Sequence, residues 1–147
     1  MILDSNLAFD GPTFAAITTT RDSTNVLDFG VARDLGIGMD LNLAIVSNQL
    51  FAGGTNVTIS LQGSPDNSTY TVYAQSPAIT LAQFNNVGLF FPVDIPRRPY
   101  PTLALPRYFK LTYTVSGTFT AGAVQAYLLL NRDDVVYYGS NYNNQYT

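Results

Sequence analysis

The side chains of this sequence that are best suited to acid–base chemistry are aspartates, because it contains no histidine, cysteine or glutamate. Asp133 and Asp134 are adjacent and could in principle supply the two carboxylates of a glycosidase. On a β-strand, however, neighbouring side chains point to opposite faces. We therefore interpret this pair as the solvated end of a strand.

A second group of aspartates recurs at a regular interval, but the interval is too long for a calcium-binding loop. Four aspartates recur every six residues, at Asp22, Asp28, Asp34 and Asp40. A calcium loop of the EF-hand type needs oxygen ligands packed much more closely along the chain. The nearby Gly36 and Gly38 lack the third glycine and the helix of a phosphate-binding loop. The sequence predicts no catalytic residue, metal site or cofactor, and no enzymatic activity.

Charge and hydropathy exclude two further classes of partner. The net charge is −3, and the seven basic residues are dispersed except for Arg97 and Arg98, so the basic stripe of a nucleic-acid-binding protein is missing. No stretch approaches the roughly 20 apolar residues that span a membrane. The opening "MILDSNLAFD" carries Asp4 and no basic region, which is unlike a signal peptide. We expect neither nucleic acid nor membrane to be a partner.

Apolar and polar residues alternate with a period of two in many segments, as in half-buried strands. Residues 55–63, "TNVTISLQG", place Val57, Ile59 and Leu61 on one face. Similar patterns occur at 40–47, 69–76, 87–93, 107–116 and 123–131, and weaker ones at 12–20, 25–32 and 78–84. In 69–76 the pattern predicts that Tyr70, Val72 and Ala74 share a face. About eight short strands and no helix are therefore expected, which indicates a β-sandwich or barrel.

The longest connection is rich in proline. Residues 92–106 contain five prolines, which favour an extended, stiff chain and exclude a central strand. Arg97, Arg98 and Tyr100 lie within this connection. A planar guanidinium suits carboxylates of a protein partner, and a stiff loop loses little entropy on binding. The alternative is a solvated loop whose cations only keep it in water.

Both ends of the chain have the composition of contact segments. Residues 133–147, "DDVVYYGSNYNNQYT", contain no lysine, arginine or glutamate, and four tyrosines: Tyr137, Tyr138, Tyr142 and Tyr146. Tyrosine provides contact area at a low entropic cost, whereas disordered segments are usually poor in aromatic residues. The N-terminal apolar residues Ile2, Leu3, Leu7 and Phe9 predict a second arm. We divide the chain into a domain at 1–132, including this short arm, and a C-terminal arm at 133–147. The alternative is that the ends have no partner.

Three stretches resemble a known family: "MILD" at the start, "LDFGVARDLGIG" at 27–38 and "RYFKLTYTVSGTFTAGAVQAYLLLNRDD" at 107–134. They are similar to the jelly-roll capsid cement proteins of short-tailed bacteriophages of the Bordetella-phage type. The resemblance implies a single jelly-roll β-sandwich with extended terminal arms. It also implies a virion protein, made in the bacterial host cytoplasm, that binds the outer surface of an HK97-like shell. The implied partners are the major capsid protein and a second copy of the chain, as a homodimer in preference to a trimer. The residues carried over as structural are Gly30, Arg33, Asp34, Gly36, Gly38, Gly117, Phe119 and Gly122.

Two other functions fit an all-β domain of this composition. Jelly rolls often bind sugars on aromatic platforms, and Tyr70, Tyr73, Tyr100 and Tyr127 are candidates for one. A receptor-binding virion protein is the other alternative, because such proteins are also rich in strands.

Overall fold

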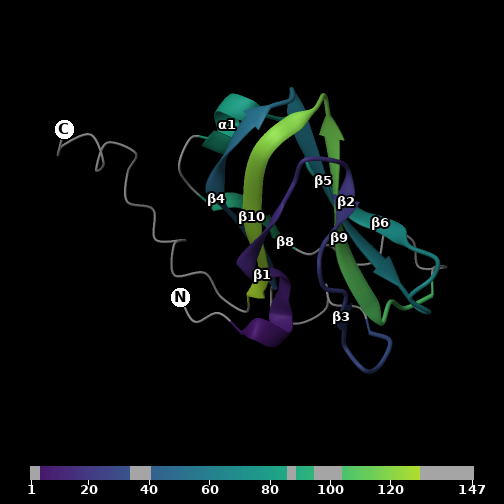
Figure 1. Cartoon of the computed structure of the whole chain (residues 1–147). Coiled ribbons are helices and arrows are strands. Elements are labelled where there is room, and N and C mark those ends of the chain that lie inside the picture. The colour runs from purple at the N-terminus through teal and green to yellow at the C-terminus, as the bar shows by residue number, and fades with distance from the viewer. Residues whose placement is uncertain (1–3, 34–40, 86–88, 95–103, 130–147) are drawn as a thin grey trace.

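The computed structural model describes residues 4–33, 41–85, 89–94 and 104–129, which fold into two antiparallel sheets packed face to face (Figure 1). Sheet A has the order β1 (Ala8–Ala16), β10 (Phe119–Leu129), β4 (Asn42–Gly53) and β8 (Leu89–Asp94). Sheet B has the order β2 (Arg21–Asp22), β9 (Tyr108–Ser116), β5 (Asn56–Ser64) and β6 (Thr71–Gln75); β3 (Leu27–Asp28) also pairs with β9, and β7 (Ile79–Thr80) with β5.

The order of the strands is that of a jelly roll. β2 and β3 pair with the same neighbour and act as one interrupted strand, as do β6 and β7. Counted in this way the described residues form eight strands, with the first, eighth, third and sixth in sheet A and the second, seventh, fourth and fifth in sheet B. Two interleaved Greek keys of this kind define the jelly-roll fold. The expected all-β sandwich of about eight strands is confirmed.

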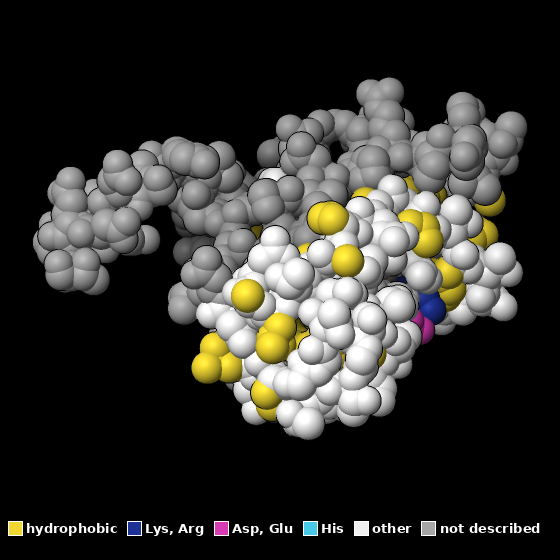
Figure 2. Space-filling view, turned by 90° about the horizontal axis from the view of Figure 1, so that it is seen from above, with side chains coloured by type: hydrophobic (Ala, Val, Ile, Leu, Met, Phe, Trp, Pro, Cys, Tyr) yellow, Lys and Arg dark blue, Asp and Glu magenta, His cyan; other side chains and the backbone are white. Residues whose placement is uncertain are grey.

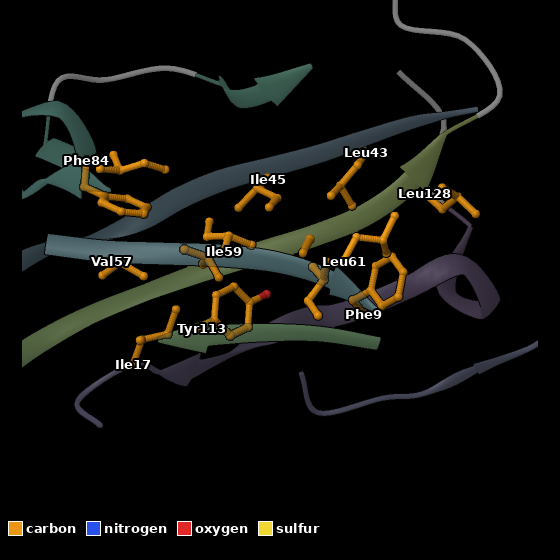
Figure 3. Packing of buried hydrophobic residues seen from close by; sticks show 14 of the residues in the cluster. Phe9, Ile17, Leu43, Ile45, Val57, Ile59, Leu61, Phe84, Tyr113 and Leu128 are labelled. Atoms are coloured by element: carbon orange, nitrogen blue, oxygen red, sulfur yellow. The ribbon is translucent and has the colours of Figure 1, made fainter. Parts of the chain in front are cut away.

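The core lies between the sheets and is formed by the residues that alternate along the strands (Figure 3). Val57, Ile59 and Leu61 of β5 are buried, as their spacing predicts. Phe109 and Leu111 of β9 face the core in the same way. Each such side chain contributes about 1.5–3 kcal/mol when it is removed from water, so the alternation itself specifies which faces of the sheets meet.

In β6 the alternation predicts the wrong side chains to face the core. Val72 is exposed, whereas Tyr73 and Ala74 both pack against the core. The cause is a register shift between the pairs Leu61–Ala74 and Gln62–Val72, where β6 is irregular. The prediction that Tyr70, Val72 and Ala74 share a face is therefore wrong, because such an irregularity moves every following side chain to the other face.

A short helix, α1 (Leu81–Asn85), replaces the strand expected at 78–84 beyond Thr80. Thr80 and Gln83 form a capping box: the Thr80 backbone N–H donates to Gln83 Oε1 at 2.8 Å and the Gln83 N–H donates to Thr80 Oγ1 at 3.4 Å. The helix is fixed to β4 because the Asn85 side chain binds the backbone N–H and carbonyl of Phe51 at 2.7 and 2.8 Å. It closes one end of the core with Phe84, whose ring centroid lies 4.6 Å from that of Phe51.

The sandwich has two ends of different construction. We call the end that holds α1, the β4–β5 turn and the β9–β10 turn the turn end; it is at the top of Figure 1. We call the opposite end, where β10 finishes and β9 begins, the loop end. Because β9 and β10 are joined by only two residues, Gly117 and Thr118, the first residue of β9 and the last of β10 must both lie at the loop end.

Candidate protein-contact surface

Most residues predicted to contact a partner lie outside the described ranges, and only two of them have a described environment. Those outside are Ile2, Leu3, Arg97, Arg98, Tyr100, Tyr137, Tyr138, Tyr142 and Tyr146. The domain boundary predicted between 132 and 133 also lies outside. Leu7 closes the short 3₁₀-helix η1 (Ser5–Leu7) and packs against the core, and Phe9 is 1% exposed in β1. The prediction that Phe9 belongs to a projecting arm is wrong.

A β-bulge explains why Phe9 and its neighbour Asp10 both face inward. Ala8 pairs with Tyr127, and Asp10 with Ala126, so the register of β1 shifts by one residue between them. A bulge places two successive side chains on the same side of a sheet. Strict alternation would have put Asp10 in solvent, and the single sequence carries no signal for the shift.

Asp10 is completely buried and holds the two sheets together. Its Oδ2 accepts a hydrogen bond from the hydroxyl of Tyr113 at 2.6 Å, and its Oδ1 accepts from the backbone N–H and hydroxyl of Thr24 at 3.0 and 2.7 Å. Arg21 Nη1 lies 3.2 Å from Oδ1, with its guanidinium 5.0 Å from the centre of the Tyr113 ring. Burial and the adjacent carboxylate raise the pKa of Tyr113 well above its usual value. Both oxygens of the carboxylate are bound by Tyr113, Thr24 and Arg21. We therefore infer that this cluster stabilises the fold.

The predicted contact segments attach to the sandwich at one end. Asn42 pairs with both Leu129 and Asp94, and these two residues directly precede segments 130–147 and 95–103, which hold the tail and the paired arginines. Asn42 itself follows segment 34–40 by two residues. The other ends of the two internal segments are also joined, because the Arg33 backbone N–H donates to Pro106 O at 2.9 Å. Asp4, the first described residue, precedes η1, which packs against β10 near Tyr127. All of these points belong to the loop end.

The described surface of the loop end combines apolar side chains with a paired charge. Val31 is 56% exposed and Leu105 is 37% exposed, on two chain segments that are joined by backbone hydrogen bonds. Beside them Arg107 binds Asp28 through Nε at 2.6 Å and Nη2 at 2.8 Å. The bonds from Arg107, together with one from the Gly30 backbone N–H, lower the pKa of Asp28 to about 2. An apolar centre with a charged rim is the usual composition of a protein interface.

A second charged group continues along the outer face of sheet B. Lys110 Nζ lies 2.7 Å from Asp22 Oδ2 and 4.2 Å from the centre of the Tyr70 ring. Burial alone would raise the pKa of Asp22, but hydrogen bonds from Lys110 and Thr112 outweigh it and lower the pKa. This face is polar, and its charges are paired within the chain.

The aromatic platform expected for sugar binding is not assembled from the three tyrosines that the structure describes. Tyr70 lies under Lys110 on the outer face of sheet B, whereas Tyr73 packs against Phe109 of the core with ring centroids 5.6 Å apart. Tyr127 is buried in sheet A. Tyr100 lies outside the described ranges. Because these rings occupy different layers, they cannot stack on one sugar.

Within the ranges that the structure describes, no group of three or more histidine, cysteine or acidic side chains is placed to hold a metal ion. No helix there is long and apolar enough to cross a membrane. The order of the strands in the two sheets makes this an all-β protein of the jelly-roll class.

A comparison with family models identifies the family. The Bbp16 model matches residues 13–128, and the chain therefore belongs to the Bbp16 family. The name is that of a Bordetella phage protein family, which makes this chain a bacteriophage protein. A search of the curated proteins found no match.

Proposed function

We propose that this protein is a capsid cement protein that binds the outer surface of an HK97-like icosahedral phage shell and stabilises it. Its partners are the major capsid protein and a second copy of itself, as a homodimer on the surface of the virion. The role requires no catalytic group. The observation that supports it best is the attachment of the predicted contact segments to one end of a self-sufficient sandwich.

Segments that leave from one end can contact a surface together. Contacts that are linked through one rigid body act at a high effective concentration, so each of them can be modest. The loop end also exposes Val31 and Leu105, which lose water when a partner covers them. A protein repeated many times over a shell can stabilise it in this way.

In the part of the chain that the structure describes, the turn end lacks comparable segments. The β4–β5 and β9–β10 connections there are two-residue turns, and the rings of Phe51, Phe84 and Phe119 close the core beside them. Figure 2 looks onto this end and, where residues are coloured, shows hydrophobic side chains that are mostly scattered among backbone atoms and other side chains. Singly scattered apolar residues are normal for a free surface. We therefore propose that the loop end faces the shell and the turn end faces solvent.

Removal of residues 133–147 tests the tail. We expect the truncated protein to fold but to co-sediment at lower occupancy with shells that lack their own copies. A matched variant changes Tyr137, Tyr138, Tyr142 and Tyr146 to serine and keeps the length of the chain. If the rings provide the contact area, this variant loses occupancy too. Undiminished occupancy of both variants would contradict a role of the tail in attachment.

The proline-rich connection is tested by separating charge from shape at Arg97 and Arg98. Replacement of both by alanine removes the charge and the planar guanidinium group. Replacement by lysine keeps the charge and loses the bidentate hydrogen-bonding geometry. We expect both variants to bind shells less tightly, and the lysine variant to recover only part of the affinity. If the wild type and both variants bind shells equally, Arg97 and Arg98 do not contact the shell.

A further inference from the structure

The outer face of sheet A, which points away from the core, carries a cluster of apolar side chains beside the polar Asn42 and Gln125. Ala8 and Ala44 flank Tyr127 in one row across β1, β10 and β4, and Leu129 is two residues further along β10. These four side chains form a cluster separate from the main core. They are on the outer face because their neighbours Leu43, Ile45, Ala126 and Leu128 face the core.

The outer face of sheet B has the opposite character. It carries Asp22, whose carboxylate accepts hydrogen bonds from Lys110 and Thr112, and Gln62 opposite Lys110. A polar outer face is expected of an antiparallel sheet that meets water on one side. Sheet A therefore departs from the pattern, and its four apolar side chains are buried although they lie on an outer surface.

We propose that the outer face of sheet A is the docking surface for residues 133–147 of the same chain. β10 is one of the two inner strands of this face and ends at Leu129, with three residues between it and the start of that segment. Residues after Asp134 number thirteen, against eleven in β10, and an extended chain advances about 3.3 Å per residue. The tail is thus long enough to return along the whole strand.

The composition of the tail matches this surface. It has four tyrosines and no lysine, arginine or glutamate, and the row it would cover consists of Tyr127 between two small alanine side chains. In an extended segment Tyr137 and Tyr138 point to opposite sides. One ring can therefore pack on sheet A while the other faces outward. Docking on the same chain is favoured over docking on another copy, because linkage raises the effective concentration.

Docking of the tail on sheet A does not require that the protein binds a shell. A tail anchored on sheet A starts at the loop end, so the outward ring of the Tyr137 and Tyr138 pair stays near the end that is proposed to face the shell. The docking itself is a property of the isolated protein and is measured without shells. Failure of the docking test and failure of shell binding can thus be told apart.

The absence of cysteine from the sequence provides a clean test. Ala44→Cys introduces a single thiol beside Tyr127, and Thr114→Cys introduces one at an exposed position on sheet B. Each is made in the full chain and in a chain that ends at Arg132, and the rate of reaction with a disulfide reagent is measured. Thermal unfolding of all four proteins reports whether each one folds.

We expect the Ala44→Cys thiol to react about tenfold or more faster in the shortened chain, because thiol exchange requires access to the sulfur. The Thr114→Cys thiol should react equally in both lengths. Equal rates for Ala44→Cys in both lengths, fast or slow, would overturn the proposal. So would protection of the shortened Ala44→Cys chain by added full-length protein, since that would assign the occupant to a second copy.

Discussion

The two ends of the sandwich use their residues in different ways. At the turn end the connections are short, and glycines allow aromatic rings to seal the core: Phe119 lies over Gly54, and Phe51 over Gly122. At the loop end the connections are long, the terminal segments begin there, and Val31 and Leu105 remain exposed. Both ends are packed, since Phe109 contacts Phe29 and Tyr73 at the loop end, but only the loop end carries the predicted contact segments.

The largest effect is expected at the turn end. Gly122 has φ +139°, and a Cβ there would overlap the ring of Phe51. Gly122→Val combines overpacking with backbone strain and should lower the free energy of unfolding by about 4 kcal/mol. Denaturant titration measures this. A variant as stable as the wild type would show that the packing of Phe51 over Gly122 does not stabilise the turn end.

A somewhat smaller loss is expected from the polar cluster that joins the sheets. Asp10→Ala leaves the Tyr113 hydroxyl and the Thr24 groups without their acceptor and should cost about 3 kcal/mol. Tyr113→Phe removes one hydrogen bond and keeps the ring, so about 1–2 kcal/mol is expected. If Asp10→Ala proves no worse than Tyr113→Phe, the carboxylate does not organise the cluster.

The smallest effect is expected from the charges of the loop end. The pKa of Asp28 is about 2 in the folded protein and 3.8 in the reference state, so its stabilising pairing is fully present above about pH 4. It is lost as the pH falls toward 2. The difference in denaturation midpoint between the wild type and Asp28→Asn should therefore shrink over this interval. A difference that does not change with pH would exclude ionisation of Asp28 as its cause.

The alternation of residues was sufficient to predict most of the strands and most of the core, but the strand predicted at 12–20 lies at Ala8–Ala16, and only Leu27–Asp28 of 25–32 is a strand. Val57, Ile59 and Leu61 occupy the predicted face because a regular strand transmits its period directly to burial. The inward turn of Asp10 and the exposure of Val72 were not predictable, since each depends on a local register shift. The helix had a signal, Thr80 and Gln83 at capping-box spacing, but five residues are too few for a hydrophobic period.

The sequence was sufficient to predict which residue types form the contact segments. It was not sufficient to predict where these segments attach to the sandwich. The tyrosine-rich tail and the paired arginines are visible in the sequence. Their attachment to the same end follows only from the order of the strands, which brings Asn42 between Leu129 and Asp94. Val31 and Leu105 carried no signal at all, because a single apolar residue in a connection has no period.

The most direct measurement compares shell binding by variants at the two ends. Val31→Asp with Leu105→Asp places charge on the loop end, and Leu50→Asp does so at the turn end, where Leu50 is 67% exposed. Changes at exposed positions should alter stability by no more than about 0.5 kcal/mol. We predict that the loop-end variant binds shells about tenfold or more weakly, as at the centre of an interface, and that Leu50→Asp binds like the wild type. Loss of binding by Leu50→Asp with full binding by the loop-end variant would contradict the account.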